Sequence, residues 1–164
     1  MNRHPAVAGA AGALLASLVI RLFRAADLTD MNLEILTGSF FTGQADATAW
    51  RLGLLLHVLA GAGFGGVYAA LFRLFRLAGA QFGIAVAAYH AVLTGVLLPL
   101  QDAGHPLVQA GDLLPSGPFA AELGLLEPAL LVAVHLLYGA VVGSLLPAAA
   151  AEPARPRSLT EIRR

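Results

Sequence analysis

The chain has 164 residues, of which 58% are hydrophobic and only 12% charged, and its formal net charge is zero. A soluble domain carries roughly 25% charged residues, so this composition excludes an ordinary water-soluble protein. The ten basic residues are all arginine and form no patch for nucleic acid, and the lack of cysteine excludes disulfides and thiolate sites.

Four apolar stretches predict four membrane-spanning helices, because about 20 apolar residues cross a hydrocarbon core of about 30 Å. We expect these helices at about residues 6–23, 51–73, 81–100 and 127–148. Charged residues flank the stretches and do not recur on one helical face, which argues against buried helices of a soluble protein. The predicted fold class is all-α, a four-helix transmembrane bundle that forms one domain over residues 1–150.

The first stretch also has features of a cleaved signal peptide, since Arg3 precedes an apolar run with small residues. However, Arg21 and Arg24 follow the run directly. We therefore expect this stretch to remain as the first membrane helix.

The connections between the helices alternate in charge. Seven of the ten arginines lie in the N-terminus, the second connection and the C-terminal tail, whereas eight of the ten acidic residues lie in the first and third connections. Arginine near short loops favours the cytoplasmic side. We therefore predict both termini in the cytoplasm, two acidic loops outside, and a disordered cytoplasmic tail over 151–164.

The two outer loops contain signals for short interfacial helices. Asp30 is a suitable cap for a helix over 31–37 that ends at Gly38, and Pro118 suits the first position of a second helix that ends at Gly124. Trp50 follows the first loop. We expect it at the outer membrane interface, because tryptophan side chains are enriched there. His105, in the third connection, is expected to be a solvated loop residue.

An internal repeat links the second and fourth predicted helices. Both read His-x-x-x-Gly-x-x-x-Gly, as His57, Gly61 and Gly65 and again as His135, Gly139 and Gly143, offset by 78 positions (135 − 57). This pattern predicts two related helical hairpins. The same offset sets Gly12 against His90, so the third histidine has no counterpart.

Small residues four apart lie on one helix face and let another helix backbone come close. Gly61, Gly65, Gly139 and Gly143 form such faces, and the other two helices offer Gly83 and Gly12. We therefore predict tight helix packing through these six glycines.

Three histidines interrupt the predicted helices at similar depth, His57, His90 and His135. Ionisable residues inside a membrane are costly and mark a candidate functional site. They are candidates to ligate haem or a metal ion, or to form a quinone or proton site with Tyr89 and Tyr138 as hydrogen-bond partners. Plain hydrogen bonding between helices is the structural alternative.

The run His57, Gly61, Gly65 and Tyr68, followed by Leu97-Leu98-Pro99 and by His135 to Gly139, resembles a family of small four-helix prokaryotic membrane proteins of unknown function. The resemblance covers about residues 6–147. It implies the fold and a bacterial or archaeal inner-membrane location, and it implies no catalytic residue.

No hydrolase, metalloprotease or phosphate-loop motif is present in the sequence. We therefore expect a multi-pass protein without enzymatic activity of its own. Its partners would be the lipid bilayer and other membrane subunits or further copies of itself, in the role of an accessory or small subunit. A haem-, metal- or quinone-binding redox protein and a small transporter or channel are the alternatives.

Overall fold

The computed structural model describes residues 4–146, and these residues form helices and loops without a β-strand. The four long helices are α1 (Pro5–Ala25), α3 (Ala47–Phe75), α4 (Ala80–Gly104) and α6 (Glu127–Leu145). Three short elements lie in the connections: α2 (Leu33–Thr42), α5 (Pro106–Ala110) and the 3-10 helix η1 (Pro118–Ala120). The all-α prediction is confirmed, and the tail predicted to be disordered, 151–164, lies outside the described residues.

The long helices contain 21, 29, 25 and 19 residues, which corresponds to about 28 to 44 Å at 1.5 Å per residue. By length and composition, each is able to cross a membrane. Large apolar side chains such as Leu59, Val96 and Leu100 are exposed on their outer faces, as contact with lipid requires. The predicted set of four apolar helices suited to a multi-pass membrane protein is thus confirmed.

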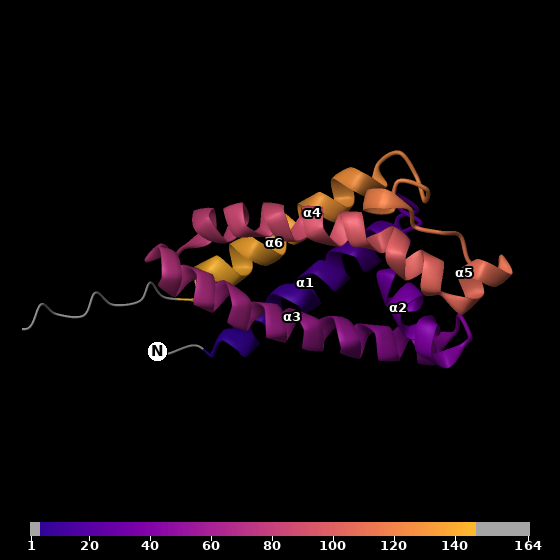
Figure 1. The fold of residues 1–164 in the computed structure, drawn as a ribbon, viewed down its shortest axis with the longest axis horizontal. Helices are drawn as coiled ribbons and strands as arrows, with labels where there is room; N and C mark the ends of the chain where they lie inside the picture. The colour runs from indigo at the N-terminus through magenta and orange to yellow at the C-terminus, as the bar shows by residue number, and fades with distance from the viewer. Residues whose placement is uncertain (1–3, 147–164) are drawn as a thin grey trace, which may run out of the picture.

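The helices follow the order α3–α1–α6–α4, because α1 packs on α3, α6 packs on α4, and α1 packs on α6. Figure 1 shows α3 and α4 along opposite sides of the molecule, with α1 between them. We call the end that carries α2, α5 and η1 the loop end, and the end where α3 turns into α4 the turn end. Helix α1 begins and α6 ends at the turn end.

Glycines bring the helices into backbone contact toward the turn end. A Cβ atom on Gly9 of α1 would collide with the Gly61 carbonyl of α3, and one on Gly83 of α4 would collide with the Gly139 carbonyl of α6. Gly65 and Gly143 lie one turn further along α3 and α6, where an added Cβ atom would collide with the carbonyls of Pro5 and Gly79 respectively. Gly12 instead makes room for the ring of Tyr138.

The first connection differs from the prediction for residues 31–37. Helix α2 begins after Asn32, whose side chain accepts a hydrogen bond from the Ile35 amide, and it ends at Gly43. Asp30 is therefore not its cap, and Gly38 does not end it. Gly38 instead lies inside α2 and faces the Ala49 carbonyl of α3, where a Cβ atom would collide. The close backbone approach, which the sequence pattern does not show, fixes α2 along the first half of α3.

The third connection also folds inward. Only one 3-10 turn forms at Pro118, and Phe119, with a left-handed φ of 56°, places its ring where a Cβ on Gly95 of α4 would be. Leu125 in the same connection is 96% exposed. The prediction of a helix from Pro118 to Gly124 is therefore wrong. Phe119 turns its ring into the space that the missing side chain of Gly95 leaves, and this conformation interrupts the helix.

His105 is fully buried, so the expectation of a solvated loop residue is also wrong. Its Nε2 donates to the Leu36 carbonyl at 2.9 Å and lies 3.2 Å from Ser39 Oγ, both in α2. Its Nδ1 accepts from the backbone amides of Leu107 and Val108 and caps α5. One imidazole therefore ties the two inserted connections together at the loop end.

Candidate functional site

A cavity of about 480 Å³ lies between the α1–α3 pair and the α4–α6 pair. We call it the central cavity. His57, His90 and His135 all line it, together with polar side chains of Thr37, Thr94, Gln101 and Tyr138. The remaining wall is apolar and comes mainly from these side chains: Ala16, Ile20, Leu33, Phe41, Leu56, Ala60, Phe64, Leu98 and Val134.

The central cavity continues sideways into a second space of about 600 Å³, which we call the lateral opening. The two spaces share Thr37, Phe41, Phe64, His90, Thr94, Leu98 and Gln101. The lateral opening adds apolar residues that are exposed on the outer faces of α2 and α4, among them Phe40, Leu93 and Leu100. The histidines are therefore reached from the apolar surface of the helices through a gap between α2 and α4.

His90 and His135 lie against each other, with ring centroids 4.9 Å apart and the rings nearly perpendicular. His90 also stacks on Phe64 with centroids 4.0 Å apart. His57 lies on the opposite wall, where its Nδ1 shares a hydrogen bond of 2.9 Å with Ser17 Oγ of α1. The structure thus brings two of the three predicted histidines into contact and places the third across the same cavity.

The hydrogen bond of His135 fixes which of its ring nitrogens is available. Nδ1 donates to the Leu131 carbonyl at 2.8 Å, so in the neutral ring Nε2 holds the lone pair and is free to accept a hydrogen bond. Nδ1 of His90 is buried and has no hydrogen-bond partner within residues 4–146. Nε2 of His135 and Nδ1 of His90 are therefore available for hydrogen bonds to a ligand in the cavity.

The two tyrosines predicted to assist the histidines lie in different places. Tyr138 is buried, and its hydroxyl donates to the Gly61 carbonyl at 2.6 Å, which joins α6 to α3. Tyr89 is 82% exposed on the outside of α4, so its predicted hydrogen bond to a histidine does not form. The reason is helical geometry, since Tyr89 directly precedes His90 and so points about 100° away from it. The rings of Tyr138 and Tyr68 both lie near His90, with centroids 5.8 Å and 6.2 Å from it.

The geometry gives little support to the haem and metal alternatives. Within residues 4–146, no three histidine or carboxylate side chains gather closely enough to hold a metal ion. An iron bound between His90 and His135 would need a porphyrin ring between two imidazoles that already touch. The cavity is therefore better suited to a ligand that forms hydrogen bonds than to one that ligates through iron.

The site includes a carboxylate that sequence reasoning assigned to an outer loop. Glu34 lies in the first turn of α2, is 4% exposed, and places its Oε1 3.9 Å from His57 Nδ1. The available signal was its setting, since Leu33, Ile35 and Leu36 surround it with apolar side chains. The four long helices lack such a carboxylate at their centres, and α2 supplies it.

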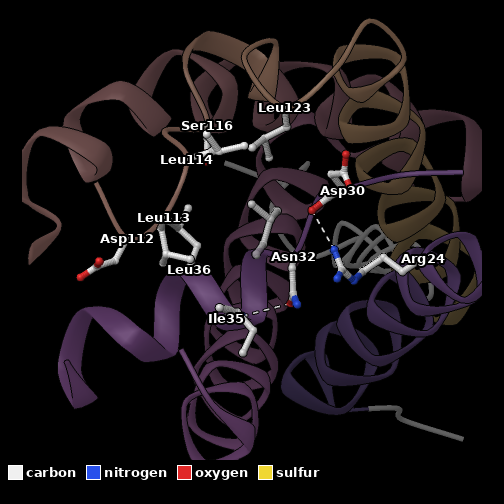
Figure 2. Close-up of a pocket in the computed structure, with 11 residues that line it drawn as sticks. Arg24, Asp30, Asn32, Ile35, Leu36, Asp112, Leu113, Leu114, Ser116 and Leu123 are labelled. Carbon is white, nitrogen blue, oxygen red and sulfur yellow. Dashed lines mark hydrogen bonds between the residues drawn. The ribbon is translucent and has the colours of Figure 1, made fainter. Parts of the chain in front are cut away.

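A third hollow, the vestibule, opens at the loop end beside the start of α2 and measures about 410 Å³. Figure 2 shows Arg24 and Asp30 on one side of it and Asp112 on the other, with Arg24 Nη1 donating to the Asp30 carbonyl at 2.7 Å. Leu33 lines both the vestibule and the central cavity, and it is the one residue that the two linings share. Leu33 thus lies on the wall between the vestibule and the cavity that the histidines line.

Two buried carboxylates hold the loop-end connections in place. Glu127 Oε2 accepts from Thr29 Oγ1 at 2.5 Å, and Glu127 Oε1 accepts from the Asp30 amide at 3.0 Å. Asp102 Oδ2 accepts from the Gly117 amide at 2.8 Å. These contacts hold two segments of the vestibule wall in place, at Asp30 and next to Ser116.

No protein-family model matches this chain, and neither the curated proteins nor the solved structures include a match. The resemblance to a family of small prokaryotic membrane proteins therefore stays a prediction.

Proposed function

We propose that the protein crosses the membrane four times and binds a lipid-soluble molecule with a polar, hydrogen-bonding head, of the quinone or quinol class, in the central cavity. The observation that supports this most is the continuity of the histidine-lined cavity with an apolar lateral opening. Ligand sites in proteins commonly enclose 300–1,000 Å³, mostly apolar with a few convergent polar groups. The central cavity has this size and this composition.

The polar groups suit a ring that bears oxygen atoms on opposite edges. Nε2 of His135 is placed to accept a hydrogen bond from a hydroxyl, as in a quinol. The hydroxyl of Thr94 and the amide of Gln101 line the cavity as donors for a carbonyl, as in a quinone. The apolar tail of such a molecule would leave through the lateral opening and remain in lipid.

Two measurements on the purified protein test this proposal. Solvent extraction followed by mass spectrometry should find a lipid-soluble compound in stoichiometric amount, and a decyl-substituted benzoquinone should raise the melting temperature. The stabilisation should be lost in His135→Ala and in Thr94→Trp, which fills the cavity, and retained in Tyr89→Ala, which alters the outer face of α4. A protein without bound compound whose melting temperature the quinone leaves unchanged would contradict the proposal.

A role as a small subunit of a larger membrane complex, or in self-association, is the second candidate. Gly63 and Gly66 lie on the outer face of α3, where an added Cβ would meet no atom of the described chain within 4 Å. Small residues on a lipid-facing surface favour close approach of another helix. Gly63→Leu should then release partner polypeptides that co-purify in mild detergent, and a lone monomer in the unaltered protein would oppose this role.

We further propose that the two termini lie in the cytoplasm of a bacterial or archaeal cell, as the arginine distribution favours. Because the chain lacks cysteine, single cysteines placed at Gly43 and at Arg76 can report the orientation. A membrane-impermeant thiol reagent added to intact cells should label the cysteine at Gly43 and spare the one at Arg76. The opposite pattern would reverse the orientation.

The relatedness of the two hairpins is also a proposal, and the glycine contacts support it with an altered register. Gly9 faces Gly61 as Gly83 faces Gly139, so the first helices of the two hairpins correspond with an offset of 74 positions (83 − 9). The offset of 78 holds for the second helices. His90 then corresponds to Ala16 and not to Gly12, because Gly83 and Gly139 lie 56 positions apart (139 − 83) whereas Gly9 and Gly61 lie 52 apart (61 − 9).

A further inference from the structure

Beyond ligand binding, we propose that Glu34 and His57 form a proton-binding pair that exchanges protons with the vestibule past Leu33. This inference does not depend on a ligand in the central cavity. It rests on the position of Glu34 in the first turn of α2, and on the vestibule and the central cavity, which share Leu33 in the same turn.

The pair and the hydroxyl that holds His57 come from three helices. Glu34 of α2 is 4% exposed, and its Oε1 lies 3.9 Å from His57 Nδ1 of α3. Ser17 of α1 shares a 2.9 Å hydrogen bond with the same nitrogen. A charged carboxylate enclosed in an apolar bundle is costly unless it is paired or protonated. The adjoining imidazole of His57 can either pair with the carboxylate as an imidazolium ion or leave the proton on the carboxyl group.

The pair has three protonation levels. With one shared proton it consists of carboxylate and imidazolium, or of carboxylic acid and imidazole, and is neutral overall. Uptake of a second proton gives carboxylic acid and imidazolium, and loss of the first gives carboxylate and imidazole. A gap of 3.9 Å exceeds a hydrogen bond, so a small movement or one bridging water carries the proton between Oε1 and Nδ1.

The surroundings provide a route on one side. Leu33 lies next to Glu34 in α2 and forms the shared wall between the vestibule and the central cavity. The charged groups that line the vestibule are Arg24, Asp30 and Asp112. On the other side, the titratable groups across the cavity are His90 of α4 and His135 of α6. The vestibule and the cavity that His57 lines thus meet at Leu33.

Infrared difference spectroscopy of the full chain in lipid nanodiscs, between neutral and acidic pH, tests the pair. We expect a carboxyl C=O band that is lost in Glu34→Gln and retained in Glu122→Gln, whose side chain is exposed. In His57→Gln, which keeps a polar partner for Ser17, this band should shift in frequency. A Glu34 that serves only as a fixed ion pair would show no such band over the pH range in which the protein is folded, and that result would overturn the proposal.

The access route is tested by the rate at which the same band shifts after transfer to D₂O. Leu33→Ala should speed this exchange, whereas Leu114→Ala, on the exposed side of the vestibule, should leave it unchanged. Equal rates in the two variants would remove Leu33 as the barrier. If Glu34→Gln does not fold, the band shift in His57→Gln alone decides whether the pair is coupled, and an unshifted band overturns it.

Discussion

At the turn end, α1 meets α3 and α4 meets α6 backbone to backbone, whereas toward the loop end the two pairs stand apart around a cavity. The turn-end contacts run through glycines on all four helices, where an added Cβ would strike a carbonyl of the partner helix. The loop-end half is instead filled from outside, by α2 along α3 and by the ring of Phe119 at Gly95 of α4.

The comparison separates two ways of packing apolar helices. Small residues remove the space between helices and leave no room for a ligand. Inserted segments keep the helices apart and bring in buried polar side chains of their own, here Glu34 and His105. The turn end therefore holds the helices together, and the loop end contains the cavity and its polar side chains. Four substitutions test this division, in order of decreasing expected effect.

The largest effect is expected at the turn end, in Gly83→Leu. The side chain would strike the Gly139 carbonyl, so α4 and α6 must separate, at a cost of about 3 kcal/mol or more. The melting temperature in detergent should fall sharply or folded protein should be lost. Gly63→Leu is the matched control, since it faces no atom of the described chain and should leave the stability of the isolated protein nearly unchanged. Equal losses in both variants would mean that backbone contact is not what holds this region.

The next effect is expected at the loop end, in His105→Ala. The change removes the hydrogen bond to the Leu36 carbonyl and the cap of α5, and should cost about 2–3 kcal/mol. Hydrogen–deuterium exchange should rise in α2 and α5 and stay low around Gly83 and Gly139. His4→Ala, an exposed cap of α1, is the control. Uniformly faster exchange along all helices would show that the two regions unfold as one.

A smaller effect is expected at the boundary between the regions, in Tyr138→Phe. The hydroxyl that donates to the Gly61 carbonyl is lost while the ring that fills the space at Gly12 remains. A loss of about 1 kcal/mol is expected, measurable by chemical denaturation in detergent. The exposed Tyr89→Phe should change stability by less. No difference between the two variants would assign the role of Tyr138 to its ring alone.

The smallest effect is expected at the loop-end surface, in Arg21→Gln. The guanidinium carbon lies 5.0 Å from the centre of the Trp50 ring, and such a contact is worth about 0.5–1 kcal/mol at an exposed site. Because Trp50 is the single tryptophan of the chain, its fluorescence should change in Arg21→Gln and remain unchanged in Arg51→Gln. An unaltered emission spectrum would contradict the contact.

The predictable part of the fold coincides largely with the turn end. Apolar stretches of sufficient length indicate four helices, and glycines four residues apart show which faces meet, because both follow from local spacing. The same spacing does not reveal partners. The glycine pairs that meet are Gly9 with Gly61 and Gly83 with Gly139. Which glycines pair depends on how the connections bring the helices together, which local spacing does not show.

The candidate site was predictable only where it lies on the long helices. His57, His90 and His135 interrupt apolar stretches and are visible as such, and they do line one cavity. Glu34 and His105 belong to connections that are rich in polar residues. The apolar neighbours of Glu34 are a local sign of its burial, whereas no residue next to His105 indicates that it is buried. Tyr89 was instead predicted to belong to the site and does not, because a residue next to His90 in the sequence lies on a different face of the helix.

Photoaffinity labelling in native membranes tests the central claim, a cavity open to lipid at the loop end and closed at the turn end. A lipid-soluble azidoquinone should label α4 between His90 and Gln101 and α2 between Thr37 and Phe41, and excess unlabelled quinone should suppress the label. The segment from Gly83 to Ala87 should remain unlabelled. Label spread evenly over all four long helices, or label that does not compete, would contradict the account.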